Sequence, residues 1–426
     1  MRNIDLDADD IAAALLAQGG GQGVCILDSC GVRHLGSRLM IADAEPVETL
    51  ELNGPDANKT LTRFEDFINK GLPAIFTLGY GLGLSLNRIE SIHNEAEPFI
   101  YAAAFDALAI HDYITGKTVL RGESEAVNRL ATRLSDCSSD LDIGATAHTI
   151  NSNFTQDEYA SAVLSIQERI RAGDTYQTNL TRRITAELPA SLSPYQIFLR
   201  LRKDHPAPFA AFIERRDSTV ISASPERFFR IQDGAISTSP IKGTRPRGAT
   251  TEEDARLREE LANSSKDRAE NTMIVDLLRN DLGRVCEFGS VEVERLCEIE
   301  EHPTLFHLVS TISGRLRDRT TVGDVIRALF PCGSITGAPK ISTMRIIDEI
   351  ERSARGLSMG AVGIYMPASF GMGEFIDTSV AIRTMTVRGR MAEFNVGGGI
   401  VIDSDPMAEY QETVTKSLAL LSALGL

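Results

Sequence analysis

The sequence predicts an α+β fold with large antiparallel β-sheets. Segments typical of strands cluster between blocks typical of helices, without the strict strand–helix alternation of a doubly wound parallel sheet. The chain has 426 residues, of which 42% are hydrophobic, so it is too apolar for disorder and too long for one ordinary core. No run approaches about 18 unbroken apolar residues, which argues against a membrane span.

Residues 1–115 are expected to form a smaller N-terminal lobe of the same α+β body, made mainly of short strands and turns. The segments 23–29 and 73–83 are typical of strands, and 57–71 contains a short helix. The glycine run at 79–83 lacks the G-x-G-x-x-G spacing, and no strand–helix crossover frames it. We therefore interpret this run as a tight turn and not as a dinucleotide site.

A linker is expected at residues 116–153, between this lobe and a catalytic region at 154–426. The linker range holds a helical stretch at about 126–134 and then a polar run that breaks sharply at Phe154. The chain has no internal repeat and no long low-complexity tract, so this change of composition is the best candidate boundary.

The catalytic region is expected to begin with a helix. Thr155 and Glu158 form a capping box, apolar residues follow at helical spacing, and Gly173 stands where a C-terminal glycine belongs. A last helix is expected to begin at Pro406, with Asp405 as its N-cap. Between them we expect strands at 175–185, 208–214, 218–223, 226–231 and within 359–402, two helices within 252–283, and a helix at about 338–351 with Pro339 in its first turn.

The charge composition limits the possible partners. Lys and Arg number 44 against 59 Asp and Glu, so the formal net charge of −15 disfavours nucleic acid and anionic membranes. An anionic substrate would need local Arg, Lys, backbone N–H groups or a divalent cation.

The acidic N-terminus does not resemble a secretory signal. Six scattered cysteines without a C-x-x-C pair favour reduced thiols in a cytoplasmic protein over disulfides or zinc.

Acidic pairs on two expected helices are the strongest candidate for a metal site. Asp267 and Glu270 share one helical side, and so do Glu409 and Glu412. Two such pairs on neighbouring helices are a plausible oxygen cage for Mg²⁺, with positions left for water and a ligand carboxylate. For either helix alone a solvated acidic face is the better explanation. Apolar neighbours of Glu270 nevertheless indicate half burial, where an ionised carboxylate needs a cation or hydrogen bonds.

Lys242 lies in the segment P-I-K-G-T at 240–244. An apolar residue precedes it and Gly-Thr follows, so it is badly placed for a mere surface charge. A lysine in a cleft can lose its proton and act as a nucleophile or a base. This segment by itself favours a structural ion pair over catalysis.

Glycine-rich segments and one histidine are weaker candidates. Residues 333–340 enter a helix and 397–399 end a strand, where exposed backbone N–H groups attract carboxylate or phosphate. Tight backbone packing explains these glycines equally well, and 333–340 lack the spacing of a Walker loop. His307 has apolar neighbours, which is typical of a satisfied core histidine.

Taken together and in order, these segments resemble the chorismate-binding enzymes, a family that includes anthranilate synthase component I, aminodeoxychorismate synthase component I, and the isochorismate and salicylate synthases. The resemblance covers about 154–420, and the N-terminal third matches only loosely, at 27–29 and 79–83. It implies sheets packed face to face with helices on the outside. The matching segments are 176–180, 224–228, 240–244, 266–281, 307–310, 333–340, 382–384, 397–399 and 409–416.

Within the family the resemblance is nearest to the aminodeoxychorismate synthases, which carry lysine at the position of Lys242 where anthranilate synthases carry alanine. It implies that Lys242 attacks C2 of chorismate while Glu226 protonates the departing 4-hydroxyl. Ammonia then adds at C4 and expels the lysine. A well-oriented amine gains up to about 7–11 kcal/mol from intramolecular reaction. Glu226 would need a raised pKa from partial burial. His307 matches a histidine of both enzyme classes and is included as catalytic.

The resemblance also implies Mg²⁺ on Glu270 and Glu412, with Asp267 and Glu409 close by through water. Gln177 stands where isochorismate and salicylate synthases usually place a water-activating lysine, which favours ammonia as the nucleophile. The residues that the resemblance places on the substrate are Gln177, Thr244, Ser334, Arg383, Gly398, Gly399 and Lys416.

The family's G-A-V-G-Y run departs here, because Tyr365 is displaced by one residue. Either a bulge restores the tyrosine or its contact with a substrate carboxylate is lost.

The ammonia is expected from a separate glutamine amidotransferase subunit, since Cys25 lacks the glycine that follows an amidotransferase cysteine. The expected product serves p-aminobenzoate and folate synthesis. Two alternatives stay open: anthranilate synthase component I, against which Lys242 argues, and a non-catalytic chorismate-binding scaffold.

Overall fold

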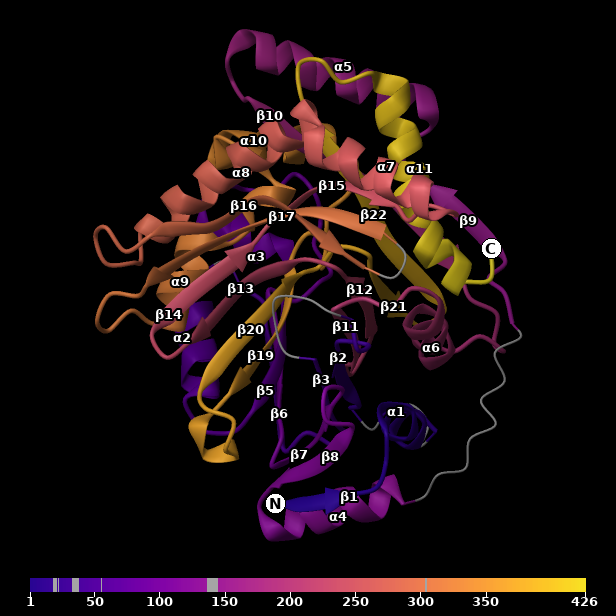
Figure 1. The fold of residues 1–426 in the computed structure, drawn as a ribbon, viewed down its shortest axis with the longest axis vertical. Helices are drawn as coiled ribbons and strands as arrows, with labels where there is room; N and C mark the ends of the chain where they lie inside the picture. The colour runs from indigo at the N-terminus through magenta and orange to yellow at the C-terminus, as the bar shows by residue number, and fades with distance from the viewer. Residues whose placement is uncertain (18–20, 22, 33–37, 55, 136–144, 303–304) are drawn as a thin grey trace.

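The computed structural model describes residues 1–17, 21, 23–32, 38–54, 56–135, 145–302 and 305–426. Two antiparallel sheets form its frame (Figure 1). In order across the first sheet lie β1 (Arg2–Ile4), β8 (Lys117–Gly122), β7 (Ala107–Asp112), β3 (Leu39–Asp43), β2 (Cys25–Asp28), β11 (Phe209–Glu214), β12 (Thr219–Ser224), β21 (Thr384–Arg388), β22 (Met391–Ile400), β10 (Gln177–Glu187) and β18 (Gly337–Ala338), with β9 (Thr149–Ser152) also paired to β10.

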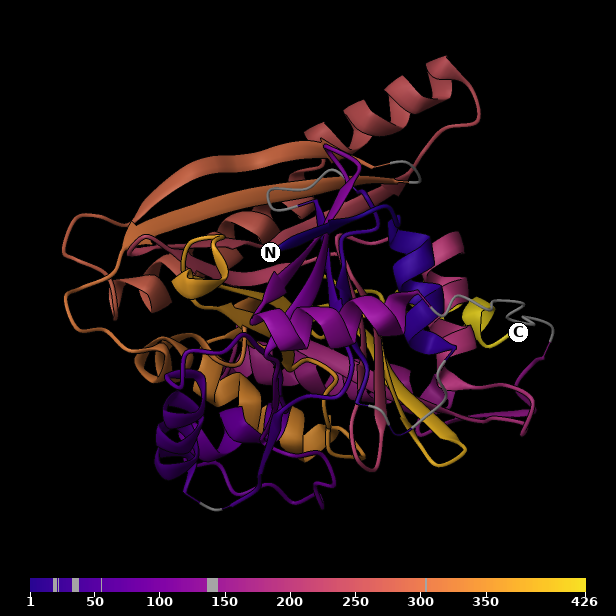
Figure 2. The same cartoon turned by 90° about the horizontal axis from the view of Figure 1, so that it is seen from below.

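The second sheet runs across the other half of the molecule. Its order is β15 (Ile241–Pro246), β17 (Leu305–Arg315), β14 (Ala235–Ser239), β13 (Arg227–Gln232), β20 (Phe375–Val380), β19 (Ala361–Met366), β5 (Ala74–Leu78), β6 (Ile100–Ala104) and β4 (Glu48–Leu52), with β16 (Glu292–Glu301) also paired to β17. Seen from below, the long strands β16 and β17 run along one edge of the molecule (Figure 2).

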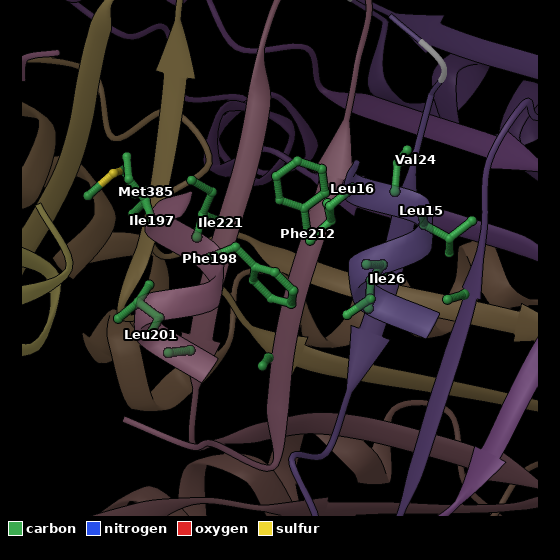
Figure 3. Packing of buried hydrophobic residues seen from close by; sticks show 14 of the residues in the cluster. Leu15, Leu16, Val24, Ile26, Ile197, Phe198, Leu201, Phe212, Ile221 and Met385 are labelled. Carbon is green, nitrogen blue, oxygen red and sulfur yellow. The ribbon is translucent and has the colours of Figure 1, made fainter. Parts of the chain in front are cut away.

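Three apolar layers follow from the alternation of side chains along these strands. Between the sheets, Ile41 and Ala211 of the first pack with Ile75 and Val362 of the second. The outer face of the first sheet is covered by α1 (Ala8–Leu16), α4 (Ser124–Leu134), α6 (Pro194–Asp204) and α11 (Pro406–Ala423), and Figure 3 shows part of this packing. The outer face of the second is covered by α2 (Ala57–Ile68), α3 (Tyr80–Leu86), α8 (Ser265–Gly283), α9 (Val322–Leu329) and α10 (Lys340–Ile350). This arrangement confirms the expected fold class.

The helix ends confirm the caps expected from sequence. At the start of α5 (Gln156–Ala172), Thr155 and Glu158 make both halves of the capping box, and Gly173 ends the helix at φ +85°. Asp405 caps α11 by accepting hydrogen bonds from the N–H groups of Met407 and Ala408. The two helices expected within 252–283 are α7 (Thr251–Asn263) and α8.

Two local expectations are wrong. Residues 79–83 do not form a tight turn, because α3 begins at Tyr80 and Gly79 is its N-cap. A Cβ on Gly83 would come within 2.4 Å of the Pro331 ring, so this glycine permits close packing against a neighbouring segment. The helix expected at 338–351 begins later, at Lys340, because Gly337 and Ala338 pair with β10 as the short strand β18.

The first 115 residues contribute strands to both sheets. β2 pairs with β11 and β5 pairs with β19, so strands far apart in sequence lie side by side. Within the expected linker, β8 pairs with β7 across residue 115, and α4 and β9 follow; residues 136–144 of that range lie outside the described residues. The division into lobe, linker and catalytic region stays a prediction. Among the described helices, none has the length and apolarity needed to cross a membrane.

Candidate active site

The elements that carry the predicted site residues converge at one end of the two sheets. β15, α8, α11 and the end of β22 lie close together in the upper part of Figure 1, next to β10 and α10. α8 packs on β15 and β17, α11 packs on β22, and the 3₁₀ turn at Gly333–Ile335 packs on α8. The second sheet and its helices therefore supply the reactive side chains, and β10 and β22 of the first sheet supply backbone beside them.

Lys242 and Glu226 are brought into one site. The Nζ of Lys242, on β15, donates a hydrogen bond to the carbonyl oxygen of Ser334 at 3.0 Å. Glu226, immediately before β13, is 4% exposed, and its Oε1 has no hydrogen-bond partner in the described part of the chain. The charge of each side chain shifts the pKa of the other. In the described residues no carboxylate lies within ion-pair distance of the Lys242 amine, whose hydrogen bond goes to a backbone carbonyl, so the structural ion pair that the 240–244 segment favours by itself is not formed. We call Glu226 and Lys242 the acid–amine pair.

Burial shifts both groups of this pair toward their neutral forms. Burial raises the pKa of Glu226, against smaller opposing effects of a hydrogen bond with Ser334 and the charge of Lys242. Burial also lowers the pKa of Lys242, against the opposing charges of Glu226 and Glu270. A protonated carboxyl group can donate a proton and a free amine can attack carbon. The site therefore favours the two protonation states that an acid and a nucleophile need.

A bulge in β15 aims Lys242. The register with β17 shifts between Ile241 and Thr244, and Gly243 between them has φ +85°. A Cβ at Gly243 would also lie 2.9 Å from the side chain of Asp267 on α8, so both the backbone conformation and the close approach require glycine. The K-G-T sequence thus forms a β-bulge that places the Lys242 amine beside α8.

The α11 acids and Lys416 form a second group, next to the glycines of β22. The Nζ of Lys416 lies 2.6 Å from a carboxylate oxygen of Glu412 and donates to the carbonyl oxygen of Gly397 at 2.9 Å. A Cβ on Gly398 would come within 3.3 Å of carboxylate oxygens of both Glu409 and Glu412. Glycine at this position therefore leaves space for the two carboxylates above the strand.

The two acids of α8 differ in their surroundings. Glu270 is half-buried, and burial raises its pKa most, while Lys242 opposes that effect and the charge of Glu412 adds to it. Asp267 instead forms an ion pair with Arg245 of β15 at 3.2 Å. The four expected ligands do not form one cluster: across the described ranges, no three acidic, histidine or cysteine side chains gather closely enough to hold a metal ion. Glu270 on α8 and Glu412 on α11 are close enough for the charge of Glu412 to raise the pKa of Glu270. Their carboxylate oxygens are ligands that suit Mg²⁺.

Gln177 lies against the glycine of β22. It is fully buried at the start of β10, and neither atom of its amide group has a hydrogen-bond partner in the described structure. A Cβ on Gly399 would come within 2.0 Å of the Gln177 Nε2. The buried, unsatisfied amide is a polar group in position to bind something other than the chain itself.

His307 lies on β17 beside Thr244, and Arg383 immediately precedes β21. The Nδ1 of His307 lies 2.9 Å from the hydroxyl oxygen of Thr244, which joins β17 to β15. Arg383 has a positive φ of 47°, and burial lowers the pKa of its guanidinium. In the described residues no carboxylate pairs with Arg383. A half-buried guanidinium without an anion in the described part of the chain is available for one, so Arg383 stays a candidate for the expected substrate contact.

No bulge in β19 returns Tyr365 to the position of the family's tyrosine. β19 pairs with β20 and with β5 in unbroken register, so alternate side chains point to opposite faces. Ile364, at the family's tyrosine position, packs between the sheets, and Tyr365 packs with the helices outside the second sheet. The bulge alternative is therefore wrong.

Sequence reasoning missed two groups at the site. Lys266 stands four residues before Glu270, and its charge acts on Glu270, Glu409 and Glu412; the i, i+4 spacing was the available signal. The carbonyl oxygen of Ser334 holds the Lys242 amine, and no sequence signal identifies a backbone acceptor in an irregular turn.

The family model for chorismate binding enzymes matches residues 22–422. The chain belongs to the chorismate-binding enzyme family. It is 37% identical to aminodeoxychorismate synthase component 1 of Escherichia coli over 94% of this chain and 92% of that protein. It is 39% identical to aminodeoxychorismate synthase of Streptomyces griseus, over 83% of this chain, and spans 51% of that longer protein.

The fold is shared with a solved structure. Anthranilate synthase component I from Streptococcus pneumoniae superposes with a TM-score of 0.80 at 27% sequence identity, covering 99% of this chain and 100% of that one. This likeness confirms the face-to-face α+β arrangement that the resemblance implied. A fold shared between anthranilate and aminodeoxychorismate synthases does not separate the two reactions, so the residues of the site must do so.

Proposed function

We propose that this chain is an aminodeoxychorismate synthase that converts chorismate and ammonia into 4-amino-4-deoxychorismate. The observation that carries the proposal is the desolvated Lys242 amine, held at 3.0 Å by the Ser334 carbonyl and paired electrostatically with the buried acid Glu226. An anthranilate synthase, which adds ammonia to the ring and eliminates pyruvate, has no need of a lysine amine at the position of Lys242. Relatives named aminodeoxychorismate synthase support the same activity.

The reaction follows from these two side chains. The free amine of Lys242 forms a bond to C2 of chorismate, both ring double bonds shift by one position, and the C4–oxygen bond breaks. Glu226 gives its proton to that oxygen, which leaves as water. Ammonia then bonds to C4, both double bonds shift back, and the C2–nitrogen bond to Lys242 breaks. Lys242 returns to a free amine, and Glu226 recovers a proton from the new C4 ammonium group, so the enzyme is unchanged after one turnover.

We further propose that Glu270 and Glu412 hold Mg²⁺. When bound, the ion supplies a positive charge for the ring carboxylate of the substrate in a protein whose net charge is −15. Glu409 stands next to Glu412 and can bind through water, and Asp267 acts through its ion pair with Arg245. The remaining groups that we place on the substrate are Gln177, Thr244, Ser334, Arg383, Gly398, Gly399 and Lys416, with His307 orienting Thr244.

The ammonia comes from a separate glutamine amidotransferase in this proposal. A glutaminase nucleophile must be a reactive thiolate. Burial instead raises the pKa of Cys25 and Cys30 strongly, of Cys286 to about 11 and of Cys332 to about 12. We place both subunits in the cytoplasm, since Cys25, Cys30, Cys286, Cys297 and Cys332 all carry free thiols.

The deciding experiment is the mass of the product. The chain is incubated with chorismate, ammonium and Mg²⁺, and a product that keeps the enolpyruvyl group is expected. Free anthranilate would show the alternative, an anthranilate synthase. Lys242→Ala is expected to abolish turnover without changing the melting temperature. Full activity in both Lys242→Ala and Glu226→Ala would contradict the proposed roles, and no turnover by the unchanged chain would support a chorismate-binding scaffold.

A further inference from the structure

A buried ion pair lies directly behind the acid–amine site. Glu351, at the end of α10, and Arg355, in the segment that follows, are 3% and 2% exposed. The Nη2 of Arg355 lies 2.7 Å from the Oε1 of Glu351, and the Nε lies 3.0 Å from the Oε2. The two side chains thus form a bidentate pair that is closed to solvent.

The remaining hydrogen-bonding groups of this pair reach the two segments that line the site. Arg355 donates to the carbonyl oxygens of Ile335 at 3.0 Å and Asn179 at 2.6 Å. Glu351 accepts from the backbone N–H of Thr181 at 2.7 Å and from the hydroxyl of Thr181 at 2.9 Å. The pair therefore joins β10, which carries Gln177, to the 3₁₀ turn that carries Ser334.

The carbonyl that Arg355 holds is adjacent to the one that holds the reactive amine. Ile335 follows Ser334, whose carbonyl oxygen accepts the Lys242 hydrogen bond. The next carbonyl, of Thr336, accepts from the backbone N–H of Asn179 at 2.8 Å. Three successive carbonyls of the turn are thus each fixed by one partner. A displacement of Arg355 would be passed to the Lys242 amine through one peptide unit.

Stability alone does not explain such a pair. Desolvating two charges costs about as much as their attraction returns, so a buried ion pair is weak evidence for stability. Arginine supplies several fixed donors in one plane, which is what holding two carbonyls and a carboxylate together requires. The guanidinium also lies 4.8 Å from the ring centroid of Tyr80, whose backbone N–H bonds to the Gly356 carbonyl at 2.9 Å.

We propose that Arg355, clamped by Glu351, is a positioning residue that sets the place and the proton affinity of the Lys242 amine. Arg355 touches neither substrate nor reacting atoms; it acts through the Ile335 and Ser334 peptides. This proposal rests on the reactive role of Lys242 under the proposed function. It goes beyond that function because it assigns the geometry of the amine to a residue pair outside the site.

The test uses Arg355→Lys, which keeps the charge beside Glu351 but cannot reach both carbonyls. The expected result is a fall in kcat of about 10-fold with a smaller change in KM for chorismate, because the amine is misplaced. The matched control is Arg202→Lys. Arg202 is 12% exposed and, like Arg355, is paired with a buried acid, Asp28, at 2.6 Å, but it lies on α6 behind the first sheet. The control is expected to leave kcat unchanged.

A second readout does not depend on turnover. The rate at which the Lys242 amine reacts with acetic anhydride is measured against pH by peptide mass spectrometry. Loss of the Ser334 acceptor favours the free amine, so labelling of Arg355→Lys at neutral pH is expected to be at least about threefold faster. Unchanged labelling and unchanged kcat, or equal losses in the Arg202→Lys control, would overturn the proposal.

The labelling also separates the two proposals. If the wild-type product is anthranilate but the labelling shift is seen, the positioning role holds and the proposed function fails. If Arg355→Lys does not fold, Glu351→Gln replaces it, because the amide oxygen can still accept from Thr181 while the bidentate pair is lost. The same direction of change is expected there, and its absence in a folded Glu351→Gln variant would refute the clamp.

Discussion

At the residue scale, the site places an acid and an amine where burial disfavours the charged form of each. If both are ionised, they attract each other, but Glu226 keeps an oxygen without a hydrogen bond in the described chain. If both are neutral, the desolvation cost disappears and both are ready to react. The chemistry therefore depends on burial more than on either residue type alone.

The pH dependence follows from the directions of the two pKa shifts. Activity needs the Lys242 amine free, so it falls as pH drops below the lowered pKa of Lys242; it also needs Glu226 protonated, so it falls as pH rises above the raised pKa of Glu226. Glu226→Gln is expected to lower kcat by about 10²–10⁴-fold and to remove the fall at high pH. The remaining limb should move to lower pH, because the negative charge that favours the lysine cation is gone.

This profile is measured as kcat against pH with saturating ammonium and Mg²⁺. Lys416→Gln provides a comparison, since Lys416 pairs with Glu412 at the surface of the same site and should change KM for chorismate more than the limb at high pH. A Glu226→Gln variant that keeps the high-pH fall would show that another group is the acid.

Sequence could identify the residue types of the site but not how they are held. The resemblance at 224–228 and 240–244 predicted Glu226 and Lys242 as reactive residues, whereas 240–244 by itself favoured a structural ion pair. The structure brings the two side chains into one site. The partners of these groups are backbone atoms or distant side chains, such as the Ser334 carbonyl and the Glu351–Arg355 pair. Such contacts depend on tertiary packing between distant segments: Lys242 and Ser334 are 92 residues apart, and Arg355 and Asn179 are 176 residues apart.

At the element scale, helix ends were predictable because capping is local chemistry. The Thr155–Glu158 box and the Asp405 cap each involve residues within three positions of one another. The start of α3 was not predictable in this way. Its N-terminus, Gly79-Tyr80-Gly81, lacks a side-chain cap, and the helix is fixed by packing against Pro331 and by the bond from Tyr80 to Gly356. Tertiary contacts there outweigh the low helix propensity of glycine.

The Asp405 cap ties helix stability to the proposed metal site. Asp405→Ala removes two hydrogen bonds to the first turn of α11, and a loss of about 1 kcal/mol in the free energy of unfolding is expected. Because Glu409 lies in that first turn and Glu412 follows in the next, the Mg²⁺ concentration for half-maximal activity should rise several-fold. Thr155→Ala is the matched control, since it uncaps α5, which carries no proposed ligand.

Both variants are compared by urea unfolding and by Mg²⁺ titration of activity. Thr155→Ala is expected to lose similar stability with an unchanged Mg²⁺ requirement. An equal rise in the Mg²⁺ requirement for both variants would show that general destabilisation, and not the placement of the α11 carboxylates, is responsible.

At the scale of the whole molecule, the order of strands in the sheets is the feature that sequence could not provide. Sequence patterns identified β2, β5, β10 to β13 and the strands within 359–402, but not others such as the long strands β16 and β17. They also gave no sign that β2 pairs with β11 and β5 with β19, strands that lie far apart in the chain. Such pairings are selected by the match of buried faces in three dimensions and leave no local signal. The N-terminal strands form one end of each sheet, with β1 and β4 at the edges, and β2 and β5 pair with strands of the later region. The region called a lobe therefore shares both sheets with the region that carries the site.

This topology predicts that residues 154–426 do not fold alone. Without residues 1–153, β11 loses β2, β19 loses β5, and apolar faces such as those of Ala211 and Val362 lose their packing partners. Exposed edges and apolar surface favour aggregation. The expressed fragment 154–426 is expected to be insoluble or to lack a cooperative unfolding transition by circular dichroism. Co-expression with fragment 1–153 should restore a soluble complex that aminates chorismate. A fragment 154–426 that unfolds cooperatively and binds chorismate by itself would instead show an independent catalytic domain.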